Sequence, residues 1–411
     1  MKEPASVETR KSASEEGDIV EGAGPLAGVT VVDLSRVLAG PFCTLLLADL
    51  GARIIKVEAP VCGDDARHFG PFMNGKSAYF MSLNRGKESI ALDLKAPEGR
   101  AILEGLLEGA DVLVENFRPG TLERLGYGWD TLHRRYPRLI YAAVSGFGHT
   151  GPYSQRPAYD IIVQAMGGLM GLTGHPESAP TRVGTSIGDI AAGSFLAIGI
   201  NAALYHRERG GEGMMIDVAM LDGQVAILEN AIARYAATGS VPEPLGARHP
   251  SITPFDAFAA SDGYLVIAAG NEVLFERLCA ALRRADLAQS PLFCTNALRT
   301  QHHAALKDEL ESVLGLHPVS HWLRVLDEAG IPSGPINTVD QLLADPQVVE
   351  RNMAVTMDDP VAGRLVLAGN PIKFSGFADP TERRPAPDLD GDRDRILAAL
   401  AQIPGGNGPP R

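Results

Sequence analysis

The chain has 411 residues, of which 45% are hydrophobic and 21% are charged, and its formal net charge at pH 7 is −13. This length suffices for two domains with a large core, and the composition is typical of a globular protein. The acidic balance argues against general nucleic-acid binding, which needs a basic surface.

The N-terminal segment and the cysteines bear on the compartment. We expect neither a signal peptide nor a transit peptide in the first 24 residues, and no membrane span. The four cysteines are scattered and show no CxxC spacing. This pattern predicts a cytoplasmic protein without a disulfide framework or a zinc site.

The first part of the chain alternates between short apolar runs and helical segments. The expected strands lie at residues 29–34, 53–58, 89–93, 111–115 and 138–144. The expected helices lie at residues 40–50, 97–108, 190–204 and 217–237. Strands that alternate with helices predict a largely parallel sheet in an α/β domain.

A second, smaller α+β domain is expected after a linker rich in glycine and proline. The pair Asp262-Gly263 within alternating apolar residues predicts a hairpin, and helical segments follow it. The expected organisation is a disordered tail at 1–24, the first part of the large domain at 25–237, the linker at 238–254, the small domain at 255–333, a return to the large domain at 334–400 and a disordered tail at 401–411.

The segment at residues 184–189, Gly-Thr-Ser-Ile-Gly-Asp, leads into a long apolar run. The run predicts a buried helix with Asp189 at or near its N-cap, where free backbone N–H groups and the helix dipole stabilise a carboxylate. Such a carboxylate is either a simple cap or, because it is ionised and backed by glycine, a covalent nucleophile. The local sequence leaves both interpretations open.

Polar side chains follow the ends of two expected strands. Asn116 follows one strand, where it either helps to hold a phosphate or amide ligand or forms part of an ordinary turn. Arg36 follows the first strand, where a guanidinium suits a carboxylate or phosphate, or forms an ion pair with Asp33 or Glu58.

Six motifs, spread along the chain from residue 25 to residue 337, match motifs of one known protein family. They are Pro-Leu-Ala-Gly-Val-Thr-Val-Val-Asp-Leu at 25–34, Ala-Gly-Pro-Phe-Cys-Thr at 39–44, Leu-Gly-Ala-Arg-Ile-Ile-Lys-Val-Glu at 50–58, Glu-Asn-Phe-Arg-Pro-Gly at 115–120, Gly-Asp at 188–189 and Gly-Pro-Ile-Asn at 334–337. Together they resemble the class III CoA-transferases, the superfamily of formyl-CoA transferase and carnitine CoA-transferase. The resemblance extends from about residue 25 to about residue 377.

The resemblance implies a role for several residues. It implies that Asp189 is the covalent nucleophile and that CoA is bound by Val37, Asn116, Phe117 and Arg124. It also implies a Rossmann-like large domain and a smaller α+β domain in a ring-like subunit, with two subunits interlocked in a homodimer. CoA esters are the substrates in this family, so we expect neither a cofactor nor a metal.

The chain departs from some members of the superfamily. Leu38, Ala59 and Ser145 replace the Gln, Arg and Lys of formyl-CoA transferases, which argues against formyl-CoA or oxalate specificity. The α-methylacyl-CoA racemases carry a His-Asp pair where this chain has Tyr159-Asp160. A tyrosine, with an ordinary pKa of about 10, is a poor base at neutral pH, so racemase chemistry is the alternative rather than the expected function.

Residues 36–42 and 249–258 most resemble the branch that moves CoA from succinyl-CoA to dicarboxylic acids. The resemblance predicts an acyl-CoA donor, a carboxylic acid acceptor, and transfer through an aspartyl anhydride and an aspartyl-CoA thioester. We expect Arg36 and Arg67 to hold the distant carboxylate of the acceptor, and Tyr159 to contact the substrate.

Overall fold

The computed structural model describes residues 24–402. The tails expected at 1–24 and 401–411 therefore lie outside the described residues, apart from Gly24, Ala401 and Gln402.

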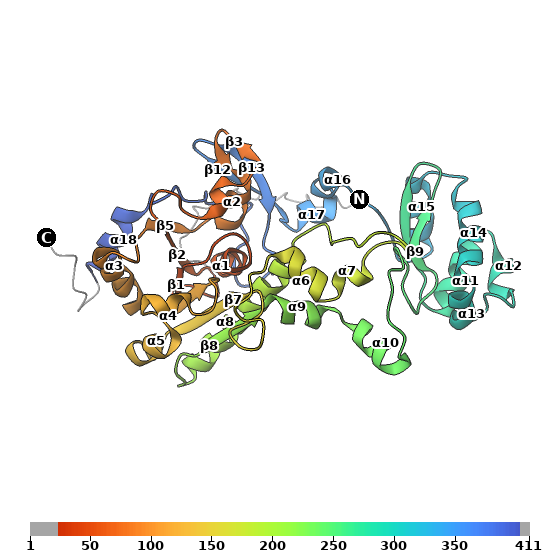
Figure 1. Ribbon diagram of the computed structural model, residues 1–411. Helices are drawn as coiled ribbons and strands as arrows, with labels where there is room; N and C mark the ends of the chain where they lie inside the picture. Colours follow the sequence, from red (N-terminus) through yellow and green to blue (C-terminus); the bar gives the residue numbers. More distant parts are fainter. Residues whose placement is uncertain (1–23, 403–411) are drawn as a thin grey trace, which may run out of the picture.

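A six-stranded parallel sheet organises the larger body of the molecule (Figure 1). In order across the sheet, the strands are β5 (Glu88–Ala91), β2 (Arg53–Glu58), β1 (Thr30–Asp33), β6 (Val112–Glu115), β7 (Ile140–Ser145) and β8 (Met215–Ala219). The expected α/β fold with a parallel sheet is confirmed. Strand order reverses between β1 and β6, and open sheets of this kind bind ligands outside the carboxyl ends of the strands at such a point.

Helices cover both faces of the sheet, because parallel strands are buried on both sides. On one face, α1 (Ala39–Asp49) and α8 (Ile187–Glu208) pack on strand residues that include Val31. On the other face, α3 (Pro97–Glu108) and α18 (Arg393–Leu400) pack on strand residues that include Val32. Successive side chains of one strand thus enter two different cores.

Helix α8 begins earlier than expected. Its N-cap is Ser186 and Asp189 is its third residue, so Asp189 lies near the N-cap, as expected, but not at it. The reason is tertiary: the carboxylate of Asp160 accepts a hydrogen bond from the Gly188 N–H and thereby completes the first turn. By length and composition α8 is apolar enough to cross a membrane, but it packs in the core against α1, β7 and β8.

The expectation of a single helix at 217–237 is wrong. The segment instead contains the second part of β8, followed by α9 (Met220–Ile227) and α10 (Asn230–Thr238). A short apolar run does not distinguish a buried strand from a helix, and pairing with β7 decides the matter here.

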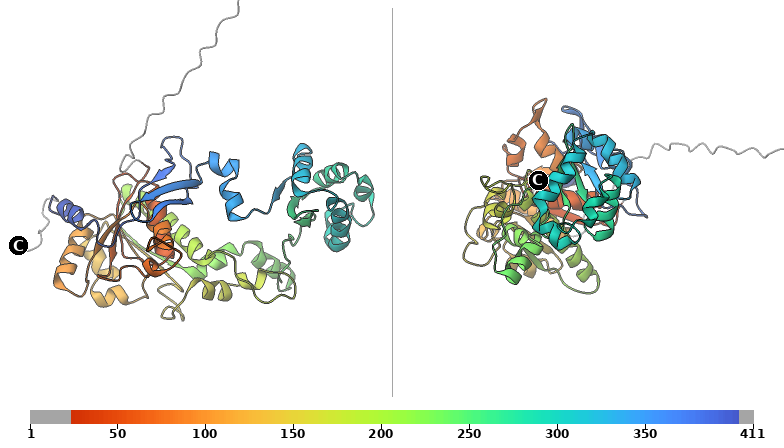
Figure 2. Two further views of the ribbon diagram at one scale, coloured as in Figure 1. Left: turned by 90° about the horizontal axis from the view of Figure 1, so that it is seen from above. Right: turned by 90° about the vertical axis from the view of Figure 1, so that its right-hand side faces the viewer.

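A second body lies well apart from the main sheet (Figure 2). The expected hairpin is present as β9 (Phe255–Ala259) and β10 (Tyr264–Ala268), and β11 (Ser333–Pro335) pairs with the other side of β10. Apolar residues of this body form a core of their own. Its helices are α11 (Glu272–Ala281), α12 (Ala285–Gln289), α13 (Asn296–Gln301), α14 (His303–Leu314) and α15 (Val319–Glu328).

The chain passes between the two bodies twice. The outward segment spans residues 239–254, and the returning segment contains α16 (Val339–Leu343) and α17 (Pro346–Glu350). The chain then adds a small sheet to the larger body, with β12 (Ala354–Asp359) between β13 (Gly363–Ala368) and β14 (Glu382–Arg383). The remaining elements are η1 (Asp65–His68), β3 (Phe72–Met73), β4 (Lys76–Ser77), α2 (Ala78–Asn84), α4 (Thr121–Leu125), α5 (Trp129–Arg135), α6 (Asp160–Met166) and α7 (Leu169–Leu172).

Candidate active site

Asp189 lies in the first turn of α8 and is half-buried. Its carboxylate has no hydrogen-bond or ion-pair partner among residues 24–402. Burial, and then the negative charge of Asp160, raise the pKa of Asp189 to about 7. A carboxylate without a partner, whose environment makes it unusually basic, is suited to nucleophilic attack.

Asp160, the first residue of α6, is buried and supports this turn. Its Oδ1 accepts the Gly188 N–H at 2.8 Å, and its Oδ2 accepts the Gln164 Nε2 at 2.7 Å. The fully buried Gln164 in turn accepts the Val183 N–H at 3.0 Å. A Cβ on Gly188 would come within 2.8 Å of Val163 Cγ2 and 2.9 Å of Asp160 Oδ1, so this close approach requires glycine.

Tyr79 of α2 is a site residue that the sequence analysis missed. Burial, followed by the negative charges of Asp189 and Asp64, raises the pKa of its phenol to about 12. The hydroxyl is therefore protonated at neutral pH and is able to donate a hydrogen bond. No motif signals this residue, because α2 and α8 are distant in the sequence.

The turns after β1 and β6 are joined by the side chain of Asn116. Its Oδ1 accepts the Arg36 N–H at 2.9 Å, and its Nδ2 donates to the Arg36 carbonyl at 2.7 Å. The next residue, Phe117, donates its N–H to Glu115 Oε2 at 2.6 Å. The structure thus brings Arg36, Asn116 and Phe117 together where the strand order reverses.

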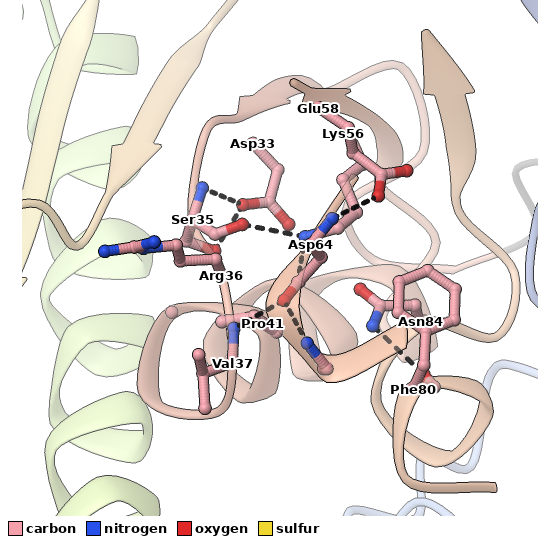
Figure 3. Close-up of polar contacts among 12 residues, drawn as sticks. Asp33, Ser35, Arg36, Val37, Pro41, Lys56, Glu58, Asp64, Phe80 and Asn84 are labelled. Carbon is pink, nitrogen blue, oxygen red and sulfur yellow. Dashed lines mark hydrogen bonds and ion pairs between the residues drawn. The ribbon is translucent and has the colours of Figure 1, made fainter. Parts of the chain in front are cut away.

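Buried charges fix the turn after β1 (Figure 3). Val37 has a φ of 67°, a left-handed conformation that is strained for a β-branched residue. Its N–H donates to Asp64 Oδ1 at 3.0 Å, while Asp64 Oδ2 pairs with Lys56 Nζ at 2.8 Å. Lys56 is fully buried and also donates to the Ser35 carbonyl at 2.7 Å. Although burial opposes it, the charge of Lys56 holds the pKa of Asp64 below its ordinary value.

A second buried pair lies at the end of β1. Asp33 Oδ2 accepts hydrogen bonds from Thr44 Oγ1 at 2.6 Å and from Lys87 Nζ at 3.2 Å. Burial, opposed by the charge of Asp33, lowers the pKa of Lys87 to about 8. The pair ties β1, α1 and the segment before β5 together beneath the site.

The two arginines expected to hold the acceptor both have acidic partners. Arg67 donates to both carboxylate oxygens of Glu58, at 2.8 Å and 2.7 Å, and lies 3.7 Å from the ring centre of Phe80. Arg36 pairs with Asp65 at 2.8 Å, which replaces the alternatives Asp33 and Glu58. The Arg36–Asp65 pair is more than half exposed, so a ligand has access to Arg36, whereas the guanidinium of Arg67 is committed to a buried carboxylate.

The other expected site residues are at the surface. Tyr159 is 75% exposed and is the N-cap of α6, next to Asp160. Arg124 is exposed in α4 and donates to Thr121 Oγ1 at 3.1 Å. Across residues 24–402, no group of three histidine, cysteine or acidic side chains is placed to hold a metal ion.

The fold and the site define an α/β protein whose candidate active site lies at the carboxyl edge of a parallel sheet. The model of CoA-transferase family III matches residues 26–393. The acetyl-CoA:oxalate CoA-transferase of Acetobacter aceti is 49% identical over 89% of this chain and 93% of its own length. The succinyl-CoA:glutarate CoA-transferase of Mus musculus is 40% identical over 91% of this chain and 86% of its own length.

A solved structure agrees with these relatives. The crystal structure of a CAIB/BAIF family protein from Brucella suis aligns with a TM-score of 0.81 at 40% identity, covering 92% of this chain and all of that chain. The chain belongs to CoA-transferase family III and is an enzyme that transfers CoA. The expected family and enzyme class are confirmed.

Proposed function

We propose that this enzyme moves CoA from succinyl-CoA to a small dicarboxylic acid, with Asp189 as the covalent nucleophile. The observation that carries the proposal is the Asp189 carboxylate, half-buried in the first turn of α8 and without a partner among residues 24–402. The mouse relative named for succinyl-CoA and glutarate supports the donor and the class of acceptor.

The proposed reaction keeps the thioester energy in covalent intermediates. The Asp189 carboxylate attacks the donor thioester, the C–S bond breaks, and an aspartyl anhydride and CoA thiolate form. The thiolate attacks the aspartyl carbonyl, which releases the donor acid and gives an aspartyl-CoA thioester. The acceptor carboxylate attacks this thioester, and the freed thiolate then takes the acceptor acyl group from the second anhydride.

Several groups of the site suit these steps. The backbone N–H of Asp189 has no acceptor among residues 24–402, and the protonated hydroxyl of Tyr79 lies nearby, so both are candidates to stabilise an oxyanion. We place CoA along the turns that contain Val37, Asn116 and Phe117, since these turns meet at the carboxyl edge of the sheet.

Oxalate, with acetyl-CoA as the donor, is the second candidate pair of substrates. The Acetobacter aceti relative at 49% identity favours it. It is weighed against Leu38, Ala59 and Ser145, where the chain departs from formyl-CoA transferases. Both candidates share a short dicarboxylic acceptor, and they differ in the length of the chain between its two carboxylates.

Chromatography of CoA esters tests the proposal. The enzyme is incubated with succinyl-CoA or acetyl-CoA and with glutarate, itaconate, malate, citramalate, mesaconate, oxalate or formate, beside an Asp189→Ala control. A new ester that is absent from the control supports the proposal and names the acceptor. If the control makes the same ester, Asp189 is not the nucleophile.

The racemase alternative has its own signature. A racemase exchanges the α-proton of an acyl-CoA with deuterium from the solvent without any acceptor acid. Exchange by the wild-type enzyme, together with no new ester from any acid in the panel, would replace the transferase proposal. The exposed Tyr159 in place of a histidine argues against this outcome.

We also propose that two ring-like subunits interlock as a homodimer. The support is an apolar surface on α8 and α9, where Ile198 is 64%, Tyr205 65% and Val225 48% exposed. Apolar side chains gathered on one face of a protein mark an interaction surface.

A further inference from the structure

We propose that Asp160 is a positioning residue for the Asp189 nucleophile, which it holds through the first turn of α8 and makes more reactive through its own negative charge. The inference rests on the proposed function, because it concerns the carboxylate that attacks the acyl-CoA.

Asp160 holds the first turn of α8 through the contact between α6 and α8. The N–H of Gly188, the residue before the nucleophile, donates to Asp160 Oδ1 at 2.8 Å. No side chain of residues 24–402 other than Asp160 caps this turn, since Ser186 makes no side-chain capping bond. The packing around Gly188 leaves no room for a Cβ. The direction of Asp189 is therefore set by where Asp160 holds the turn.

The negative charge of the Asp160 carboxylate is only weakly neutralised by nearby cations. Arg182, the cation nearest to Asp160, lies 3.9 Å away and is 47% exposed, so it neutralises the carboxylate weakly. From the same element Asp160 faces the neutral amide of Gln164, and from α2 Tyr79 faces the site as a neutral phenol. The charge of Asp160 is thus poorly neutralised, and after burial it is the second cause that raises the pKa of Asp189.

The consequence for the chemistry follows from charge balance. When an Asp189 oxygen attacks the thioester carbonyl carbon, a C–O bond forms, the C–S bond breaks, and the electron pair leaves on the CoA sulfur. No proton is gained or lost, and Asp189 becomes a neutral anhydride. Acylation therefore removes the repulsion between Asp160 and Asp189, so the fold favours the acylated enzyme over the free carboxylate.

The test compares Asp160→Asn with the wild type. The asparagine keeps an oxygen for the Gly188 N–H but loses the charge. Formation of the Asp189 adduct from succinyl-CoA or acetyl-CoA is followed against pH by hydroxylamine trapping and peptide mass spectrometry. We expect the acidic limb of the wild-type profile to move down by about one pH unit or more in Asp160→Asn, with slower adduct formation on the plateau.

Two controls separate this role from a merely structural one. Gln164→Met removes the hydrogen bonds to Asp160 and Val183 without changing a charge, so its acidic limb should stay at the wild-type position. Gly188→Ala keeps Asp160 but displaces the turn, so it should slow adduct formation at every pH by the same factor. An unshifted limb in Asp160→Asn, or the same shift in Gln164→Met, would overturn the proposal.

A second measurement needs no substrate. The free energy of unfolding is measured for the wild type, Asp160→Asn, Asp189→Asn and the double variant across the same pH range. We expect the coupling between the two positions to grow as Asp189 ionises. Absence of an adduct in the wild type would defeat the proposed function, while a flat coupling would defeat the role of Asp160 alone.

Discussion

At the scale of single residues, the folded protein destabilises the ionised form of Asp189 relative to its protonated form. Its pKa rises from 3.8 to about 7 on folding, so between these values the folded chain binds more protons than the unfolded chain. By linkage, this group makes the protein less stable as the pH rises through that window, and the loss is complete above it. A carboxylate held in this way lowers the stability of the folded protein and is more basic than an ordinary aspartate.

The first prediction is that Asp189→Asn stabilises the protein while abolishing transfer. We expect a free energy of unfolding about 1 kcal/mol higher than that of the wild type at about pH 8, after allowance for solvent screening. The difference should nearly vanish below about pH 3, where the wild-type carboxyl is largely protonated in both the folded and the unfolded state. Urea unfolding at these two values checks the prediction, and an equal difference at both would contradict it.

Asp64 and Asp65 are neighbours in the sequence with opposite surroundings. Asp64 is buried, pairs with the fully buried Lys56 and accepts the N–H of the strained Val37. Asp65 pairs with Arg36, and both partners are more than half exposed. The two aspartates carry the same charge and are adjacent in the sequence. A comparison of Asp64 with Asp65 therefore isolates the effect of burial on what an ion pair contributes to stability.

We predict that Asp64→Ala lowers the free energy of unfolding by about 3–5 kcal/mol, because it removes the ion-pair partner of the fully buried Lys56. Asp65→Ala should change it by less than about 1 kcal/mol, because exposed ion pairs contribute little. Urea denaturation of both variants is the measurement. Comparable losses would mean that the Lys56–Asp64 pair does not hold the turn.

At the scale of elements, the contact between α8 and α1 positions the helix that carries Asp189, the proposed nucleophile. A Cβ on Gly193 of α8 would lie 2.6 Å from the carbonyl oxygen of Ala39 at the start of α1, so the helices cross at a glycine. Gly223 of α9 also lies within a helix, but a Cβ there meets its nearest atom at 3.7 Å. The two glycines differ in packing and share the same helix propensity.

The third prediction is that Gly193→Ala destabilises the protein by about 1–3 kcal/mol, because overpacking forces α8 away from α1. Gly223→Ala should be neutral or stabilising by up to about 1 kcal/mol, since alanine is the better helix former and fits. Thermal unfolding of both variants measures the two changes in stability. Equal changes would show that α8 moves away from α1 without a cost in free energy. Transfer activity should fall in Gly193→Ala, because the first turn of α8 moves with the helix.

At the scale of the whole molecule, the exposed apolar surface of α8 and α9 is the observation behind the proposed homodimer. Light scattering coupled to size exclusion should give twice the chain mass of 43.6 kDa. We predict that Ile198→Glu, which places a charge on the 64% exposed Ile198, weakens the dimer without unfolding the chain. A wild-type mass of one chain would contradict the dimer, and Tyr264→Glu on the small body serves as a surface control.

The sequence by itself determined the local elements and the family. Buried strands such as Arg53–Glu58 and the helix Pro97–Glu108 have the expected bounds, because apolar runs and proline or glycine boundaries act over a few residues. The six motifs identified the family, and with it Asp189 as the candidate nucleophile. Such motifs are recognised from the identity and order of the residues, so no three-dimensional position is needed.

Tertiary structure alone decided the rest. The first turn of α8 begins after Ser186, where the Gly188 N–H bonds Asp160, and β8 is a strand because it pairs with β7. The sequence likewise did not signal the effect of the Asp189 charge on the pKa of Tyr79, or the ion pair between Arg67 and Glu58. Each depends on contacts that form only in the folded chain, and the free energy of such contacts overrides local preference.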